Sequence, residues 1–238
     1  RPQTGKIPII NREPLKAEKI KVPIDAGNRE LRNPFVITGL QKVKIESQLN
    51  PNYNFVNFIE GDSNRLARSA GMAVANKPGG TSFNPLLVYG GVGLGKTHLV
   101  HAIGVNIKDK YPDKTVLYIS SEKFTQQFID SVKSNTRNDF IHFYQMVDVL
   151  IIDDVQFLSG KVGTQDVFFH IFNHLHQNGK QVILTSDKAP VDMQDIEQRL
   201  LSRFKWGLSA ELQAPDYETR ISILDNKLFR DGVEMPED

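Results

Sequence analysis

Pro85-Leu86-Leu87-Val88-Tyr89-Gly90-Gly91-Val92-Gly93-Leu94-Gly95-Lys96-Thr97 is the stretch that decides the fold. It begins with a short apolar run and ends in eight residues that fit the pattern G-x-x-x-x-G-K-[ST]. Apolar residues then recur at helical spacing, at Leu99, Val100, Ala102, Ile103 and Ile107. A glycine-rich loop between a strand and a helix lets several backbone N–H groups converge on a phosphate chain. The stretch therefore predicts a binding site for a nucleoside triphosphate.

The residue types in this loop have separate expected roles. The backbone from Gly91 through Gly93, Leu94 and Gly95 is expected to surround the phosphates. Lys96 is expected to reach the β and γ phosphates, and the hydroxyl of Thr97 to ligate Mg²⁺. His98 follows on the helix and is expected to pack near the nucleotide. A plain glycine-rich turn is the alternative, but the flanking strand and helix favour the phosphate loop.

The composition is that of an ordinary globular protein. The 238 residues are enough for one large α/β core with an appendage, and 39% of them are hydrophobic. The chain has no cysteine, no signal peptide and no apolar run of membrane-spanning length, which together favour a protein of a reducing cytoplasm. Because it begins with Arg1, we expect a fragment or a processed form. His170 and His174 stand four residues apart but have no third ligand at suitable spacing, so no metal site is predicted there.

The first fifty residues differ from the rest. They hold ten Lys and Arg against five Asp and Glu, and six of the twelve prolines fall within the first 51 positions. This mixture predicts an extended basic linker over residues 1–51 rather than a folded domain. A basic arm that contacts nucleic acid is the alternative.

From residue 52 onward, apolar runs alternate with segments of helical spacing. The runs are Leu86–Tyr89, Thr115–Ile119, Val147–Ile152, Gln181–Thr185 and Trp206–Ser209. The helical segments are residues 97–109, 121–133, 165–178 and 195–202. Continuous apolar strands that alternate with helices predict an α/β fold with a parallel sheet covered on both faces. We place this core at residues 52–214.

Carboxylates follow the run that ends at Ile152. In a parallel sheet, ligands bind beyond the carboxyl ends of the strands, next to the phosphate loop. Asp153 is therefore expected to hold Mg²⁺, directly or through water, and Asp154 to orient or deprotonate a water that attacks the γ-phosphate. A strand that simply runs into a polar turn is the alternative.

Two further groups extend this constellation. Ser186 and Asp187 end the next strand, so one of them is expected to sense the γ-phosphate or hold the attacking water, unless Asp187 only caps the next segment. Arg199 and Arg203 stand four residues apart on one predicted helix face. One of them is expected to act on the nucleotide of a neighbouring subunit, although arginines at this spacing are usually solvent-facing.

With these residues in place, the chain resembles the AAA+ domain of the DnaA family of bacterial chromosomal replication initiators. The resemblance covers residues 52–238. The stretches that carry it are Asn57–Gly61, Asn64–Arg68, Gly90–His98, Ile152–Leu158 and Arg199–Leu208. The combination of I-D-D-x-Q-F with R-L-x-S-R-F-x-W-G-L is far more specific than either nucleotide motif alone.

The resemblance implies an AAA+ P-loop NTPase with a five-stranded parallel sheet of order 5-1-4-3-2. A small helical lid follows, of which residues 215–238 are the beginning. Family members bind ATP or ADP with Mg²⁺, and the ATP form assembles into a homo-oligomeric filament on origin DNA and promotes strand opening. Slow ATP hydrolysis serves as the off-switch.

The resemblance also carries over residue by residue. Lys96 and Thr97 match the Walker A pair, Asp153 and Asp154 match the Walker B pair, and Asp187 matches the sensor-one position.

Two arginines and two residues near the base are matched as well. Arg203 falls on the arginine finger and Arg199 on the neighbouring box VII arginine. Asn64 and Leu66 lie near the adenine by similarity.

Single-stranded DNA is the partner implied for residues 121–138, which match the initiator-specific insertion. Ile129 and Lys161 match positions where relatives place DNA-facing side chains. Two departures stand out: Gly163 replaces an arginine of some members, and Lys188 replaces an arginine that has a planar, bidentate fork.

Parts of the family pattern are expected to lie outside this sequence, which ends at Asp238. They are the sensor-two arginine, the duplex-reading helix-turn-helix and the domain through which the replicative helicase is contacted. A helicase loader or a transposition helper with the same core is the alternative function. A small-molecule kinase would have no use for Arg203, and the intact Lys96, Thr97, Asp153 and Asp154 argue against an inert scaffold.

Overall fold

The computed structural model describes residues 45–233, which belong to one compact unit, Lys44–Asp238. The predicted linker lies outside the described residues up to position 44. Among residues 45–233, no helix combines the length and the apolar character needed to cross a bilayer.

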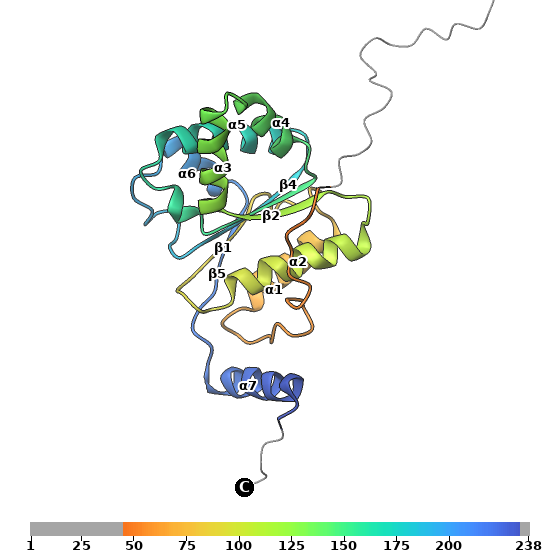
Figure 1. Cartoon of the computed structure of the whole chain (residues 1–238). Helices are drawn as coiled ribbons and strands as arrows, with labels where there is room; N and C mark the ends of the chain where they lie inside the picture. The colour runs from red at the N-terminus through yellow and green to blue at the C-terminus, as the bar shows by residue number, and fades with distance from the viewer. Residues whose placement is uncertain (1–44, 234–238) are drawn as a thin grey trace, which may run out of the picture. The chain divides into compact units, whose positions relative to one another are not determined.

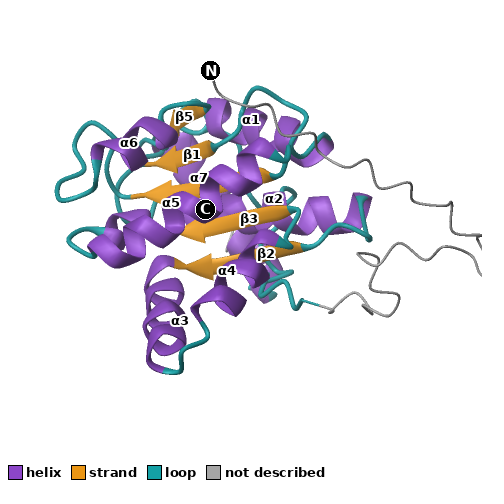
Figure 2. Ribbon diagram, turned by 90° about the horizontal axis from the view of Figure 1, so that it is seen from above, coloured by secondary structure: helices purple, strands orange, loops and turns teal. Residues whose placement is uncertain are grey.

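A five-stranded parallel sheet forms the centre of this unit, and its strands lie side by side in Figure 2. The strands are β1 (Leu86–Tyr89), β2 (Val116–Ser120), β3 (Val149–Asp153), β4 (Gln181–Ser186) and β5 (Leu208–Glu211). Their spatial order is β2-β3-β4-β1-β5, and every pairing is parallel. This is the predicted order 5-1-4-3-2 read from the other edge, so the topology prediction is confirmed. Strand β1 lies between β4 and β5, which places the loop after it next to the end of β4.

Helices cover both faces of the sheet, as predicted (Figure 1). The elements are α1 (Arg65–Asn76), α2 (Lys96–Lys110), α3 (Ser121–Lys133), α4 (Arg137–Gln145), the 3₁₀ helix η1 (Val155–Leu158), α5 (Val162–Gln177), α6 (Gln198–Phe204) and α7 (Tyr217–Asp231). Helices α1 and α2 pack on one face, and α3 to α6 pack on the other. The two faces hold separate buried clusters, because alternate side chains of each strand point in opposite directions.

Helices α1 and α4 were not among the helices predicted from apolar spacing. The buried face of α1 consists of small residues, including Gly71 and three alanines, which give a weak hydrophobic signal. Small residues serve a purpose here, since a Cβ added at Gly71 would lie 2.8 Å from Cδ1 of Ile103 on α2. Helix α4 buries Phe140 and Tyr144 in only nine residues. Packing against neighbouring elements, rather than local periodicity, therefore defines both helices.

The folded part extends upstream of residue 52, where we had placed the start of the core. Tyr118 N donates to Ser47 O at 2.9 Å, and Asn50 N donates to Nδ1 of His101 at 3.1 Å. Leu49 packs against the cluster on the α2 face and sits over Gly104, where an added Cβ would lie 2.6 Å from Leu49 Cδ2. Residues 47–50 therefore contact the core directly.

Leu49→Ala is expected to lower the free energy of unfolding by about 1–2 kcal/mol, because a half-buried leucine leaves a smaller cavity than a fully buried one. Chemical denaturation measures the change, and exposed Gln48→Ala is the matched control. Equal stability of the two variants would show that residues 47–50 do not belong to the folded core.

Candidate nucleotide site

The phosphate loop joins the end of β1 to the start of α2, as predicted. Gly90 has φ 151°, and a Cβ there would lie 2.2 Å from the carbonyl oxygen of Leu212. Gly95 precedes the first helical residue and adopts a left-handed conformation with φ 94°. Only glycine accepts both geometries without strain. The free N–H groups at the start of α2 consequently face the loop.

Lys96 is the cation at the centre of this loop, and its side chain is only 7% exposed. Its Nζ donates to the carbonyl oxygens of Gly90 and Gly91, at 2.9 Å each. The same Nζ lies 2.7 Å from Oδ1 of Asp187, which follows β4. The structure thus brings together Lys96 and Asp187, which stand far apart in the sequence.

Asp153 is the most enclosed acid of the site, at 3% exposure. Oδ2 accepts hydrogen bonds from Thr97 Oγ1 at 2.8 Å and from the Tyr118 hydroxyl at 2.7 Å. Oδ1 accepts another from Thr185 Oγ1 on β4. Burial, followed by the hydrogen bond to Asp153, raises the pKa of Tyr118, so its hydroxyl remains a donor. The hydroxyl of Thr97 and the carboxylate of Asp153 therefore adjoin, as a shared Mg²⁺ site requires.

Asp154 has an unusual backbone, with φ 59°. Its N–H donates to Thr185 Oγ1 at 2.7 Å, and Gln156 Nε2 donates to its Oδ1 at 3.2 Å. Burial raises the pKa of Asp154, as do the charges of Asp153 and Asp187, while the hydrogen bond from Gln156 opposes the shift. A carboxyl group with a raised pKa suits proton transfer better than an ordinary one.

The side chain of Gln156 hydrogen bonds to both Asp154 and Asp187. Besides its contact with Asp154, its Nε2 donates to Asp187 Oδ2 at 3.0 Å, and its Oε1 accepts from the backbone N–H of Asp187 at 3.3 Å. The side chains after β3 and β4 therefore form one hydrogen-bonded edge beside the phosphate loop.

A cavity of about 240 Å³ opens beside the loop, between it, the segment before α1 and helix α7. Gly93, Leu94, Gly95, His98 and Asn64 all line it. Leu66 does not line it, and its side chain is 61% exposed. Of the two residues expected near the adenine, Asn64 therefore lines this cavity and Leu66 does not.

Asn64 and His98 shape the cavity wall by holding neighbouring backbone. Asn64 Oδ1 accepts from the N–H of Gly61 at 3.1 Å, and its Nδ2 donates to Ile59 O at 2.9 Å. His98 Nε2 lies 2.7 Å from Oδ1 of Asn57. Burial lowers the pKa of His98. A neutral imidazole therefore faces the cavity at physiological pH.

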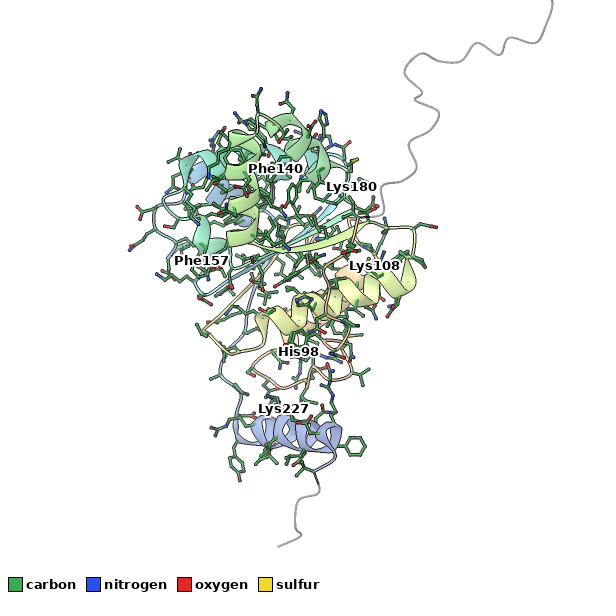
Figure 3. All side chains as sticks on the ribbon, viewed as in Figure 1. His98, Lys108, Phe140, Phe157, Lys180 and Lys227 are labelled. Carbon is green, nitrogen blue, oxygen red and sulfur yellow. The ribbon has the colours of Figure 1, made fainter. Side chains whose placement is uncertain are left out.

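Helix α7 contributes cations that sequence reasoning had not assigned. Lys227 and Arg230 line the cavity on the side opposite His98, and Figure 3 labels His98 and Lys227 on their two helices. Their positive charges also lower the pKa of His98. The lining of the cavity thus includes apolar side chains, such as Phe58 and Ile59, and two cations from α7.

Arg199 and Arg203 do not line this cavity. Arg199 pairs with Glu197 and, at 2.9 Å, with Asp166. Arg203 Nε donates to Asn173 Oδ1 at 2.8 Å, and its guanidinium lies 3.7 Å from the ring centroid of Trp206. Both arginines therefore contact groups on or near α5 and α6 rather than the phosphate loop.

The residues matched to DNA contact lie at the surface. Ile129 on α3 is 40% exposed, and Lys161 is exposed just before α5. Their elements adjoin, since a Cβ added at Gly163 would lie 3.7 Å from the Phe128 ring.

Sequence reasoning missed Tyr118, Thr185 and Gln156 among the residues that hold the site. Tyr118 and Thr185 lie within buried strand runs, where their hydroxyls had no visible partner. A usable signal was their position on the two strands that flank β3: Thr185 is the penultimate residue of β4, and Tyr118 is the third of the five residues of β2. Among the described residues, no group of three or more His, Asp or Glu side chains is arranged to hold a metal by itself.

Comparison with known proteins points to the same kind of nucleotide-binding protein as this geometry does. Residues 49–211 match the model of the bacterial DnaA ATPase domain. The chain belongs to the DnaA family. It is 78% identical over 237 residues to the chromosomal replication initiator protein DnaA of Flavobacterium psychrophilum. The match covers 100% of this chain and 50% of that protein. The chain thus spans about half the length of that curated relative.

Solved structures of the family superpose well on this chain. Domain III of the Thermotoga maritima DnaA matches with a TM-score of 0.78 and 48% identity, covering 80% of this chain and 79% of that one. A replication initiator DnaA solved with AMPPCP and single-stranded DNA matches with a TM-score of 0.75 and 41% identity, over 80% of this chain and 59% of that one. The DnaC helicase loader, at 16% identity and a TM-score of 0.60, shares the fold alone.

Thr185→Val is expected to lower the free energy of unfolding by about 1–3 kcal/mol, because it leaves the Asp154 N–H without its partner and removes the hydroxyl that donates to Oδ1 of the buried Asp153 carboxylate. Thr185→Ser keeps the hydroxyl and is the matched control. Chemical denaturation compares them, and a valine variant as stable as the serine variant would contradict this role of the hydroxyl.

Proposed function

We propose that this chain is the ATP-controlled assembly module of a bacterial replication initiator. The observation that carries the proposal lies at the carboxyl edge of the sheet. There, Lys96 Nζ lies 2.7 Å from Asp187 Oδ1, and Thr97 Oγ1 lies 2.8 Å from Asp153 Oδ2. A cation, a hydroxyl and two acids gathered at a phosphate loop suit a nucleoside triphosphate with its metal. Membership of the family and the relative solved with AMPPCP support ATP, or ADP after hydrolysis, as the ligand.

Mg²⁺ fits the residues present. The oxygens of Thr97 and Asp153 are hard ligands that lie side by side. Mg²⁺ is usually held by one or two such groups together with phosphates and waters, so these two suffice on the protein side. When bound, the ion neutralises negative charge on the phosphates. Lys96, now paired with Asp187, would exchange part of that contact for the γ-phosphate.

Residues beside the phosphate loop support ATP hydrolysis, and the family resemblance implies that this hydrolysis is slow. Asp154, with its raised pKa, is placed to orient a water or to accept its proton. Asp187 and Gln156 hold the same edge, so they position Asp154 relative to the γ-phosphate. We infer a weak ATPase that serves to switch the assembled state off.

Assembly depends on an arginine from the adjacent protomer. Arg199 already pairs with two carboxylates, whereas Arg203 contacts an amide and aromatic rings and forms no ion pair within residues 45–233. An arginine whose charge is not neutralised has more to gain from a phosphate. Arg203 is therefore our choice for the residue that completes the γ-phosphate site in trans, with Arg199 beside it.

Single-stranded origin DNA is the proposed partner of the assembled form. Ile129 and Lys161 offer an apolar and a basic contact on neighbouring surface elements. Binding through phosphates releases counterions, so we expect the affinity to fall as salt rises. A relative solved with single-stranded DNA supports this class of partner. Because such a partner is chromosomal DNA, we propose that the chain acts in the bacterial cytoplasm.

Sedimentation of the chain with a single-stranded oligonucleotide, in ATP and in ADP, tests the whole proposal. Large complexes in ATP alone are expected. Monomers in both nucleotides would favour a solitary ATPase. A helicase loader remains the second candidate on fold alone, and the family match to residues 49–211 favours the initiator.

Lys96→Ala is expected to weaken ATP binding about 10- to 150-fold, because it removes charge-assisted contacts worth roughly 1.5–3 kcal/mol. Titration calorimetry measures the affinity, with exposed Lys205→Ala as the control. Unchanged binding by Lys96→Ala would refute the phosphate-loop assignment.

Arg203→Ala is expected to leave ATP binding by the monomer intact and to abolish ATP-dependent assembly, because Arg203 does not line its own nucleotide cavity. Calorimetry and sedimentation give the two readouts. Survival of assembly would move the trans-acting role elsewhere, with Arg199 as the first candidate.

A further inference from the structure

Within its own chain, the side chain of Arg203 contacts three other side chains. Asn173 Oδ1 accepts a hydrogen bond from Arg203 Nε at 2.8 Å. The guanidinium carbon of Arg203 lies 3.7 Å from the ring centroid of Trp206 and 5.5 Å from that of Phe169. We call Phe169, Asn173 and Trp206 the Arg203 bracket. Trp206 gives the nearest of the two ring contacts.

Local structure brings Trp206 to this position. Arg203 stands in the last turn of α6, and the backbone N–H of Trp206 donates to its carbonyl oxygen at 3.2 Å. That bond closes a tight turn, so the indole returns toward the side chain three residues earlier. The ring of His176 on α5 lies 4.9 Å from the indole. Trp206 is therefore fixed between a turn and α5.

Helix α5 supplies the rest of the bracket. Phe169 and Asn173 are four residues apart and lie on the same face of the helix. Phe169 also lies 4.7 Å from the guanidinium carbon of Arg199, so the two arginines share this ring. Arg199 differs from Arg203 in being tied to Asp166 and Glu197 by ion pairs.

Trp206 is more exposed than a residue that only fills the core. Its side chain is 53% exposed, although it is the only tryptophan of the chain. An indole over a guanidinium is a favourable cation–π pair, and it leaves the charge in place. A carboxylate partner would instead compete with a phosphate for that charge. The bracket therefore orients Arg203 without neutralising it.

We propose that Trp206 is a positioning residue that holds Arg203 ready for the nucleotide of an adjacent protomer. The inference rests on the trans role of Arg203 proposed above. A free arginine loses side-chain entropy when it is ordered at an interface. The contact with Trp206 orders the guanidinium before assembly, and this lowers the protein concentration that assembly needs.

Tryptophan fluorescence of the monomer tests the contact itself, because Trp206 is the sole indole. Arg203→Met removes the cation above the ring and is expected to change the emission. Arg199→Met is the matched control, since the described contacts of Arg199 do not include Trp206, and it is expected to keep the emission of the unaltered chain. Unchanged emission in Arg203→Met would overturn the inference.

Assembly of Trp206 variants tests the positioning role. Trp206→Leu is expected to raise the protein concentration for half-maximal ATP-dependent assembly by about 2- to 30-fold. ATP affinity and the melting temperature of the monomer stay unchanged, which a general loss of fold would not allow. Trp206→Phe keeps a ring and is expected to restore part of the loss. Tyr217→Leu, which alters another exposed aromatic residue, is expected to assemble normally.

The variants separate the two proposals. If Arg203→Met prevents assembly but Trp206→Leu assembles like the unaltered chain, Arg203 acts in trans and the positioning role of Trp206 is wrong. If Arg203→Met itself assembles normally, the trans role of Arg203 in the proposed function is wrong. Loss of assembly in Arg203→Met together with a raised assembly concentration in Trp206→Leu, partly restored in Trp206→Phe, supports the inference.

Discussion

The buried carboxylate of Asp153 is the group on which the rest of the site depends. Three hydroxyls, from Thr97, Tyr118 and Thr185, hydrogen bond to it, and each comes from a different element. A buried charge is costly unless it is fully hydrogen-bonded, so these contacts constrain where α2, β2 and β4 lie relative to β3. The contacts that satisfy the buried carboxylate also place Thr97 beside it, as the proposed Mg²⁺ site requires.

The ammonium group of Lys96 imposes a second constraint on the site. Lys96 is buried with two carbonyl oxygens and Asp187 as partners. Its position links the phosphate loop to the end of β4, and Gln156 links that end to Asp154. A change of ligand at Lys96 therefore has a direct route, through hydrogen bonds alone, to the carboxyl group proposed to handle the attacking water. This arrangement suits a switch better than a fast catalyst.

Much of the fold was predictable from local patterns. The five apolar runs coincide with the five strands to within two residues at either end, and the helix beginning at Ser121 was placed at its observed bounds. The strand order came from resemblance rather than periodicity, and the structure confirms it. Helix α1 was not predicted because its buried face is made mostly of alanine and glycine. The packing of residues 47–50 on the core was not predicted because their contacts are with distant elements.

The sequence by itself determined the phosphate loop and the acids at the strand ends, because glycine, lysine and carboxylate chemistry at fixed spacing requires no knowledge of packing. Only the tertiary structure decided which hydroxyls donate hydrogen bonds to Asp153, that Leu66 does not line the cavity, and that Lys227 does. It also separated Arg199, tied by ion pairs, from Arg203, held by Trp206. Those outcomes depend on which side chains meet across the sheet and between helices, and that is fixed by packing between elements far apart in the chain.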